Sequence, residues 1–198
     1  KYYPVYAQGL SGLKSMNDGL HNTKPKKMKN GNGVIKHKYE TGEVVEILVD
    51  SNDLSEISET NVQIGSYQFS ANESKILLAT ETESIYRHSS KSIYYVYDTA
   101  DKRFIKLNDD KIRYATFSPK GNKVAYVTGN NLFIYDLDEH NTTAVTSDGK
   151  FNHIINGGLD WVYEEEFSFA KGFFWSPEGD YIAYYKFDES KVAEFSMD

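Results

Sequence analysis

Short apolar segments, separated by turn residues, make up the hydrophobic pattern of this chain. Residues 124–127 (Val-Ala-Tyr-Val) and 182–185 (Ile-Ala-Tyr-Tyr) are continuous apolar runs that each follow a glycine-containing turn. Runs of this length and composition predict strands buried on both faces. Residues 93–98 and 132–136 are also predicted to be strands, and each of these segments ends at an aspartate that begins the next turn. The pattern therefore predicts an all-β protein.

An aromatic residue followed by serine and a turn occurs three times, in residues 69–79, 117–127 and 175–185. In the second and third copies the turn reads Ser-Pro-x-Gly, in which proline presets φ and glycine accepts a positive φ. The copies lie roughly 50 to 60 residues apart, which leaves room for about four strands in each repeat. This combination is typical of a β-propeller. A β-sandwich also contains many short strands, but it does not predict the same turn at blade-length intervals.

The length of the chain suits about three and a half such blades. Residues 34–50 predict the outer hairpin of an earlier blade, with its turn at residues 40–43. Propellers usually need at least about four blades, and they must close. We therefore expect a partial β-propeller that is a piece of a larger one, or else an open stack whose edges are covered.

Composition narrows the function classes. The chain has 22 Lys and Arg against 29 Asp and Glu, and its formal net charge of −7 disfavours nucleic-acid binding because a negative surface repels phosphates. No apolar run approaches the ~20 residues that span a bilayer, and residues 1–4 lack the apolar core of a signal peptide. Cysteine is absent, which excludes disulfides, thiolate nucleophiles and cysteine-ligated zinc. The sequence predicts no metal and no other cofactor.

One stretch, residues 156–167, interrupts the repeat within the longer of the two intervals between copies. Asp160 is a good N-cap and predicts a short helix that continues to Glu166. We expect the apolar residues of this helix to anchor it to the blade, namely Trp161, Val162 and Phe167.

The predicted helix carries three successive carboxylates, Glu164, Glu165 and Glu166. On a free surface, water screens such a run, which is then a solvated helix end. In a partly desolvated funnel, the crowded charges would favour a bound cation, because an ammonium group relieves their repulsion and offers three N–H donors. The N-terminal amine of a peptide is such a cation.

Residues 160–166, Asp-Trp-Val-Tyr-Glu-Glu-Glu, resemble the double-glutamate motif of the dipeptidyl peptidase IV group, within the prolyl oligopeptidase family of serine peptidases. Residues 86–89, Tyr-Arg-His-Ser, followed by the aromatic segment 93–98, are similar to the family segment that holds its substrate-binding arginine. Residues 16–19 and the hairpin at 34–50 resemble the family's first blade. The resemblance covers essentially the whole chain, and the seven-residue motif is its most specific part.

The resemblance implies that Glu165 and Glu166 bind the free α-amino group of a peptide substrate. It implies that Arg87 contacts the carbonyl of the N-terminal residue and orients the glutamates, whereas Glu164 matches a position not assigned to the amine. Family members pair an N-terminal propeller, eight-bladed in this group, with a C-terminal α/β-hydrolase domain. They release dipeptides with Pro or Ala at the second position. Residues 1–198 would then be the N-terminal part of the propeller.

The sequence departs from a complete enzyme of this kind. It has no Gly-x-Ser-x-Gly nucleophile elbow, and none of its five histidines follows a nucleophile and an acid in the chain order of that fold. We expect no catalytic residue in this chain and no peptidase activity from it alone. It is expected to be an N-terminal fragment, a truncated chain or one piece of a nicked enzyme. The resemblance also favours an extracytoplasmic location and a homodimeric full-length protein.

A non-catalytic periplasmic or cell-surface interaction module is the alternative. Its blades would share the Ser-Pro-x-Gly turn, and the glutamate run would be an exposed acidic patch. A nucleophile elbow encoded after Asp198, followed by Asp and His, would indicate the peptidase, whereas further blades alone would indicate the module. The peptidase hypothesis further predicts that Arg87 converges on Glu165 and Glu166 within salt-bridge distance.

Overall fold

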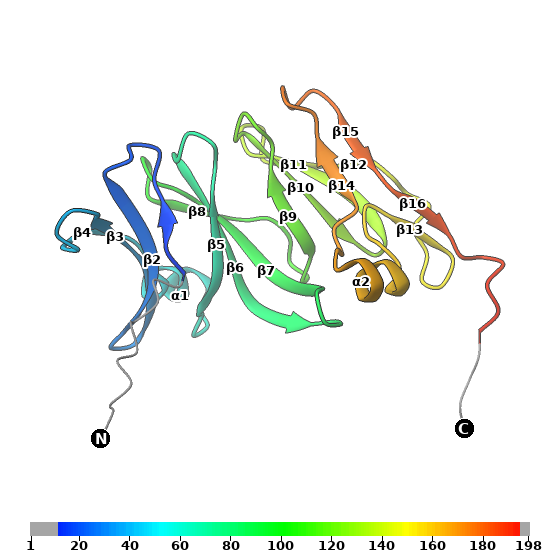
Figure 1. Cartoon of the computed structure of the whole chain (residues 1–198), viewed down its shortest axis with the longest axis horizontal. Coiled ribbons are helices and arrows are strands. Elements are labelled where there is room, and N and C mark those ends of the chain that lie inside the picture. Colours follow the sequence, from blue (N-terminus) through cyan, green and yellow to red (C-terminus); the bar gives the residue numbers. More distant parts are fainter. Residues whose placement is uncertain (1–11, 195–198) are drawn as a thin grey trace, which may run out of the picture. The chain divides into compact units, whose positions relative to one another are not determined.

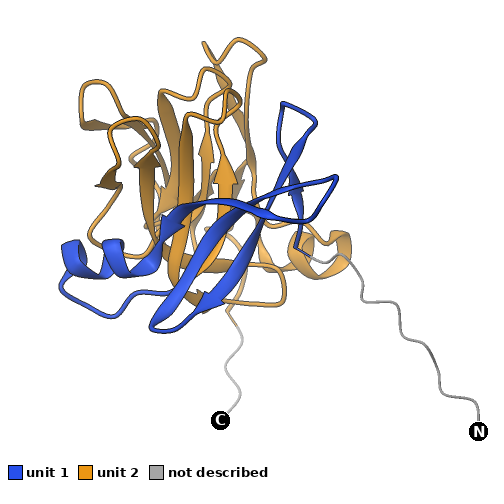
Figure 2. Ribbon diagram, turned by 90° about the vertical axis from the view of Figure 1, so that its left-hand side faces the viewer, with its two compact units in different colours: residues 1–63 blue, residues 64–198 orange. Residues whose placement is uncertain are grey.

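The computed structural model describes residues 12–194 (Figure 1). The chain divides into two compact units, residues 1–63 and residues 64–198, which Figure 2 shows in blue and orange. Residues 1–4, which bear on the expected absence of a signal peptide, lie outside the described residues.

The first unit contains a four-stranded antiparallel sheet in sequential order, followed by a short helix. The predicted hairpin is confirmed: its strands pair as Gly33↔Asp50 at one end and His37↔Val44 at the other, and Gly42 takes a φ of 71° in the turn. The helix begins because the side chain of Asp50 accepts a hydrogen bond from the Asn52 amide at 2.8 Å. The elements are β1 (Lys14–Ser15), β2 (His21–Met28), β3 (Gly31–Lys38), β4 (Val44–Asp50) and α1 (Ser51–Ser58).

The second unit contains two four-stranded antiparallel meanders, each with its strands in sequential order (Figure 1). The first meander consists of β5 (Ile64–Phe69), β6 (Lys75–Ser84), β7 (Ser90–Asp98) and β8 (Arg103–Lys106). The second consists of β9 (Arg113–Phe117), β10 (Lys123–Thr128), β11 (Asn131–Asp136) and β12 (Asn141–Ala144). Four-stranded antiparallel sheets repeated in this way confirm the partial β-propeller.

The end of the second unit is built from two short strand pairs and one helix. β13 (Ile154–Asn156) pairs with β16 (Lys186–Asp188), and β14 (Phe173–Trp175) pairs with β15 (Ile182–Tyr184). The helix α2 (Trp161–Phe167) lies in the chain between β13 and β14. It therefore interrupts the blade at the position that the sequence predicts.

The recurrent serine turns have the same hydrogen bonds in all three copies. At Ser118, the amide donates to the carbonyl of Lys123 at 2.8 Å, and the hydroxyl accepts from the Lys123 amide at 3.1 Å. The Ser118 carbonyl accepts from the amide of Gly121, whose φ is 72°. The same contacts occur at Ser70, with Lys75 and Glu73, and at Ser176, with Tyr181 and Gly179. The predicted role of the turn glycine is confirmed in the second and third copies.

Residues 124–127 are buried on both faces, as predicted. Val124 and Tyr126 pack in a cluster with residues of the preceding sheet, such as Leu77 and Val96. Ala125 and Val127 face the other way, into a cluster with Leu132 and Phe173. Strand β10 thus lies between two layers of side chains, as in stacked propeller blades.

The same prediction for residues 182–185 is wrong. Ile182 is only half-buried, and Tyr184 and Tyr185 are 40% and 49% exposed. Within residues 12–194 no further sheet covers the face of β14 and β15 that carries Phe174 and Ala183, so a run that reads as buried on both faces has one face open. An apolar run in a strand indicates burial only if both neighbouring layers are present.

Candidate functional site around helix α2

Helix α2 begins as the sequence predicts. The side chain of Asp160 accepts a hydrogen bond from the Tyr163 amide at 2.9 Å, which caps the first turn. The helix ends at Ser168, whose φ of 58° is left-handed and whose amide donates to the Glu164 carbonyl. The helix has seven residues, one more than expected.

The backbone segments on either side of α2 pair with each other, so the helix lies in an insertion whose two ends are held together. The amide of Gly172 donates to the carbonyl of Gly157 at 2.9 Å, and Gly158 bridges to Lys171. The approach is close enough to require glycine: a Cβ on Gly172 would lie 2.7 Å from the Gly158 carbonyl oxygen. The Asn156 amide donates to the carbonyl of Asn130, which attaches one end of this insertion to the preceding blade.

The predicted anchoring residues of α2 are wrong. Trp161, Val162 and Phe167 are 57%, 49% and 63% exposed. The helix is held instead by Tyr163, whose ring lies 5.1 Å from that of Phe187, and by Glu164. A single helix of two turns offers too little hydrophobic periodicity to show which side faces the blade.

Glu164 is the buried residue of the acidic run, with only 4% of its surface exposed. Its Oε1 accepts hydrogen bonds from the backbone amides of His88 and Ser89, at 2.7 and 2.8 Å. Two amide donors to one carboxylate are charge-assisted hydrogen bonds, which offset the cost of burying the charge. They join α2 to the loop between β6 and β7, two segments that Figure 1 shows approaching each other.

Arg87, in the same loop, lies beside Glu165. Its Nη2 is 3.4 Å from Oε2 of Glu165, and the side chains of Arg87 and Glu165 are 70% and 17% exposed. Glu166, the next residue of the helix, is exposed, and within residues 12–194 it forms no ion pair. The structure therefore brings Arg87 and Glu165 together, and it places Glu166 next to them along the helix without a cationic partner.

The charges of α2 oppose the helix dipole. Glu165 and Glu166 are in the last turn, where the carbonyl ends already carry partial negative charge, and that turn contains no basic residue. Carboxylates there destabilise a helix by about 0.3–1 kcal/mol each. The same arrangement concentrates negative potential at one end of α2, which suits a cation.

The loop that carries Arg87 is shaped by a bulge in β6. The pairing of β6 with β7 shifts register between Thr80 and Glu83, and Glu81 takes a left-handed φ of 49°. Such bulges bend a hairpin. At its tip, the amides of Ile85 and Tyr86 both donate to the Ser89 carbonyl, which makes a tight turn around Arg87.

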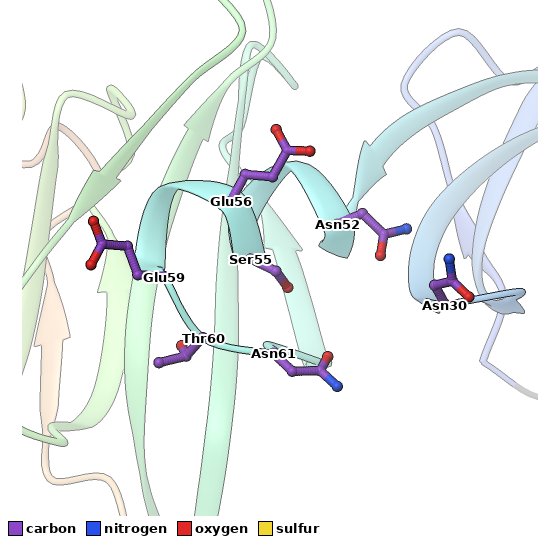
Figure 3. A pocket seen from close by; sticks show the side chains of 7 residues that line it. All are labelled: Asn30, Asn52, Ser55, Glu56, Glu59, Thr60 and Asn61. Carbon is purple, nitrogen blue, oxygen red and sulfur yellow. The ribbon is translucent and has the colours of Figure 1, made fainter.

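The first unit has an open polar depression of its own, next to α1. Its lining residues are shown in Figure 3 and are Asn30, Asn52, Ser55, Glu56, Glu59, Thr60 and Asn61. Their polar ends spread around the depression and do not converge on a point (Figure 3). Ser55 is engaged in the fold, since its hydroxyl accepts from the Val62 amide at 2.9 Å. This depression offers no comparable constellation.

Within residues 12–194 no group of three or more His, Asp or Glu side chains is arranged to hold a metal ion. In the same residues there is no helix with the length and apolar character needed to cross a membrane.

Comparison with known proteins identifies relatives for most of the chain. Residues 70–198 match the family model "Dipeptidyl peptidase IV (DPP IV) N-terminal region". Dipeptidyl aminopeptidase B of Saccharomyces cerevisiae is 39% identical over 137 residues, and prolyl endopeptidase FAP of Bos taurus is 34% identical over 164. These alignments cover 68% and 81% of this chain but only 16% and 21% of the relatives.

A solved structure agrees with these relatives. The crystal structure of Porphyromonas gingivalis dipeptidyl peptidase 4 superimposes with a TM-score of 0.83 at 36% identity, over 93% of this chain and 26% of that one. The chain thus spans between about a sixth and a quarter of the length of the proteins it matches. The matched residues include both the Arg87 loop and α2, and the chain belongs to the family of dipeptidyl peptidase IV N-terminal regions.

Proposed function

We propose that residues 1–198 are the N-terminal part of the propeller of a serine exopeptidase that releases N-terminal dipeptides. In this proposal Glu165 and Glu166 bind the free amino terminus of the substrate, and Arg87 contacts the carbonyl of its first residue. The hydrolysis itself takes place in a C-terminal α/β-hydrolase domain, because these residues contain no nucleophile elbow. Pro or Ala at the second position of the substrate is the expected preference.

The observation that carries the proposal is the ion pair between Arg87 and Glu165 beside the unpaired Glu166. Two carboxylates and one guanidinium leave one negative charge unmatched. A protonated amine supplies the missing positive charge and up to three N–H donors. An internal peptide bond supplies no charge and at most one N–H donor, so the site favours chain ends over chain interiors.

The arginine suits its proposed role because a guanidinium has several donors in a fixed plane. One N–H can hold the Glu165 carboxylate while another reaches a substrate carbonyl. A lysine would offer one compact charge and no such division of donors. The 70% exposure of Arg87 leaves its other donors accessible to a ligand.

The test uses the full-length enzyme and two substrates that differ in one group. Ala-Pro-p-nitroanilide has a free amine, and propionyl-Pro-p-nitroanilide is the same molecule without it. We expect Glu165→Gln and Glu166→Gln each to lower kcat/KM for the free-amine substrate by about 100-fold or more, while the des-amino substrate changes little. Glu178→Gln, at an exposed turn of the third repeat, is the matched control.

Labelling of the catalytic serine with a fluorophosphonate probe verifies that each variant keeps a working hydrolase domain. If both glutamate variants hydrolyse the free-amine substrate at a near-normal rate, the proposed site is wrong. Equal losses on the two substrates would also count against it, because the amine would then contribute nothing. In either case the acidic run would be a solvated surface of the propeller and not the amine site.

The proposal extends to the partners, the oligomeric state and the location of the full-length protein. The partners are a peptide with a free N-terminus and the C-terminal hydrolase domain, and the full-length protein is a homodimer. The proposed location is extracytoplasmic, as the family resemblance implies. No nucleic acid is expected to bind, given the net charge of −7.

A further inference from the structure

A buried carboxylate next to the proposed amine site has no role in the proposal above. Glu164 is 4% exposed, and its Oε1 is occupied by two backbone amides. It is therefore poorly placed to reach a substrate amine. A buried charge with two short hydrogen bonds is costly to keep unless it holds something in place.

The donors that Glu164 binds are the two residues directly after Arg87. Hydrogen bonds of 2.7 Å from His88 and 2.8 Å from Ser89 fix the chain on the C-terminal side of the arginine. Ser89 is itself 3% exposed, and its carbonyl accepts the amides that close the turn from Ile85. The backbone around Arg87 is thus clamped from both directions.

The ion pair alone does not position Arg87. The arginine side chain is 70% exposed, and exposed ion pairs contribute little because water competes for both partners. A loop at a hairpin tip is also among the more mobile parts of a fold. Fixing the loop through its backbone leaves only the side-chain torsions of Arg87 to be ordered.

The charge of Glu164 acts on a tyrosine of strand β9. Tyr114, which lies in β9 with a left-handed φ of 61°, is close enough to respond to its charge. Burial raises the pKa of the Tyr114 hydroxyl, the neighbouring Arg113 opposes this rise, and the charge of Glu164 adds to it. The hydroxyl beside Glu164 therefore remains protonated at neutral pH.

We infer that Glu164 is a positioning residue. It holds the Arg87 loop against helix α2 and so sets the distance from Arg87 to Glu165 and Glu166. The inference rests on the proposed function, since it assigns Glu164 to the same amine site. It separates the acidic run into one structural clamp and two ligands. In this assignment the buried Glu164 does not contact the substrate, and it acts by positioning Arg87 relative to Glu165 and Glu166.

The experiment again compares Ala-Pro-p-nitroanilide with propionyl-Pro-p-nitroanilide in the full-length enzyme. The readout is amine selectivity, the ratio of kcat/KM for the two substrates. We expect Glu164→Ala to lower this ratio by about 10- to 100-fold, as losses of supporting residues around a site commonly do. Glu164→Gln keeps a carbonyl oxygen that can accept both amides, so it should stay within about threefold of the wild type.

The outcomes separate this inference from the proposed function. If Glu165→Gln abolishes selectivity but Glu164→Ala leaves it within about threefold, the amine site stands and the clamp is wrong. If Glu164→Gln costs as much as Glu164→Ala, the charge of Glu164 matters rather than its acceptor, and the clamp is again wrong. If Glu165→Gln and Glu166→Gln leave selectivity unchanged, the amine site itself fails.

A second measurement does not depend on whether Glu164→Ala folds. Hydrogen exchange of the wild-type enzyme, resolved to single amides, should show slow exchange at His88 and Ser89. The amide of Glu139 also donates to a carboxylate, that of Asp136, but at an exposed turn, and it serves as a faster-exchanging reference. Exchange at His88 and Ser89 as fast as at this reference would overturn the clamp.

Discussion

Gly179 of the third serine turn lies directly against Pro119 of the second. A Cβ added to Gly179 would be 3.2 Å from Cδ of Pro119, and the φ of Gly179 is 74°. The positive φ and the close contact with Pro119 therefore both disfavour a side chain at position 179. The repeated motif does more than close a hairpin, since its glycine also allows one blade to approach the next.

Replacement of Gly179 by alanine should destabilise the propeller. Left-handed backbone costs a non-glycine residue about 1–2 kcal/mol, and contact with the rigid Pro119 ring adds to this. Gly129→Ala is the matched control, because Gly129 has a φ of 53° but no heavy atom within 4 Å of its added Cβ. Urea denaturation of the full-length protein should show a larger loss for Gly179→Ala, and equal losses would refute the contact.

The turns were predictable because their hydrogen bonds are local. A serine, a residue with positive φ and a following strand fit within about six residues, and the same contacts form in each copy. The first copy makes this turn without Pro or Gly: Glu73 occupies the glycine position with a φ of 59°. In this copy the Asn72 side chain also accepts hydrogen bonds from the Ser70 hydroxyl and the Ser74 amide, so the turn forms on local hydrogen bonds without proline or glycine.

The convergence of Arg87 and Glu165 followed from family resemblance and not from local pattern. The hydrogen bond that joins the Arg87 loop to α2 links Ser89 and Glu164, which are 75 residues apart in sequence. Hydrophobic periodicity gives no information about such a long-range contact. For the same reason the inward orientation of Glu164 was not foreseen. A glutamate in an exposed-looking acidic run gives no sign that two distant amides will bind it.

The burial predictions depended on neighbours in the same way. Val127 and Ala125 are buried because Phe173 of the next blade covers them. Tyr185 has an equally apolar sequence context but is 49% exposed, since no described strand covers its face. Hydrophobic runs predict strands well, whereas burial of a given face requires knowledge of which layers are present.

Phe173 and Phe174 are adjacent in sequence and opposite in environment, which provides a matched pair. Phe173 is fully buried against Leu132 and its neighbours, while Phe174 is 54% exposed. We expect Phe173→Ala to lower the free energy of unfolding by about 3–5 kcal/mol, from lost burial and an unfilled cavity. Phe174→Ala should cost much less. Urea denaturation of both variants tests this, and similar losses would contradict the assignment of the core.

Acid should loosen the turn before β2. A hydrogen bond from the His21 ring, joined by the Leu20 and His21 amides, lowers the pKa of Asp18 to about 2, from 3.8. Because the folded pKa is depressed, the contribution of Asp18 to stability is present above pH 3.8 and is lost as the pH falls toward 2. Hydrogen exchange at Leu20 and His21, corrected for intrinsic rates, should accelerate over this window. Asp18→Asn should remove the pH dependence, and its persistence in that variant would exclude Asp18 as the cause.

Arg87 should matter for activity and not for stability. Its ion pair with Glu165 is 70% exposed on the arginine side, so Arg87→Ala should change the free energy of unfolding by less than about 1 kcal/mol. Under the proposed function the same variant loses a ligand for the substrate carbonyl, and kcat/KM should fall by at least about tenfold. Arg103→Ala is the control, since Arg103 is also mostly exposed and pairs with Asp101 at 3.9 Å. Loss of stability in step with activity would mean that Arg87 supports the fold of its loop, and that its effect on catalysis is indirect.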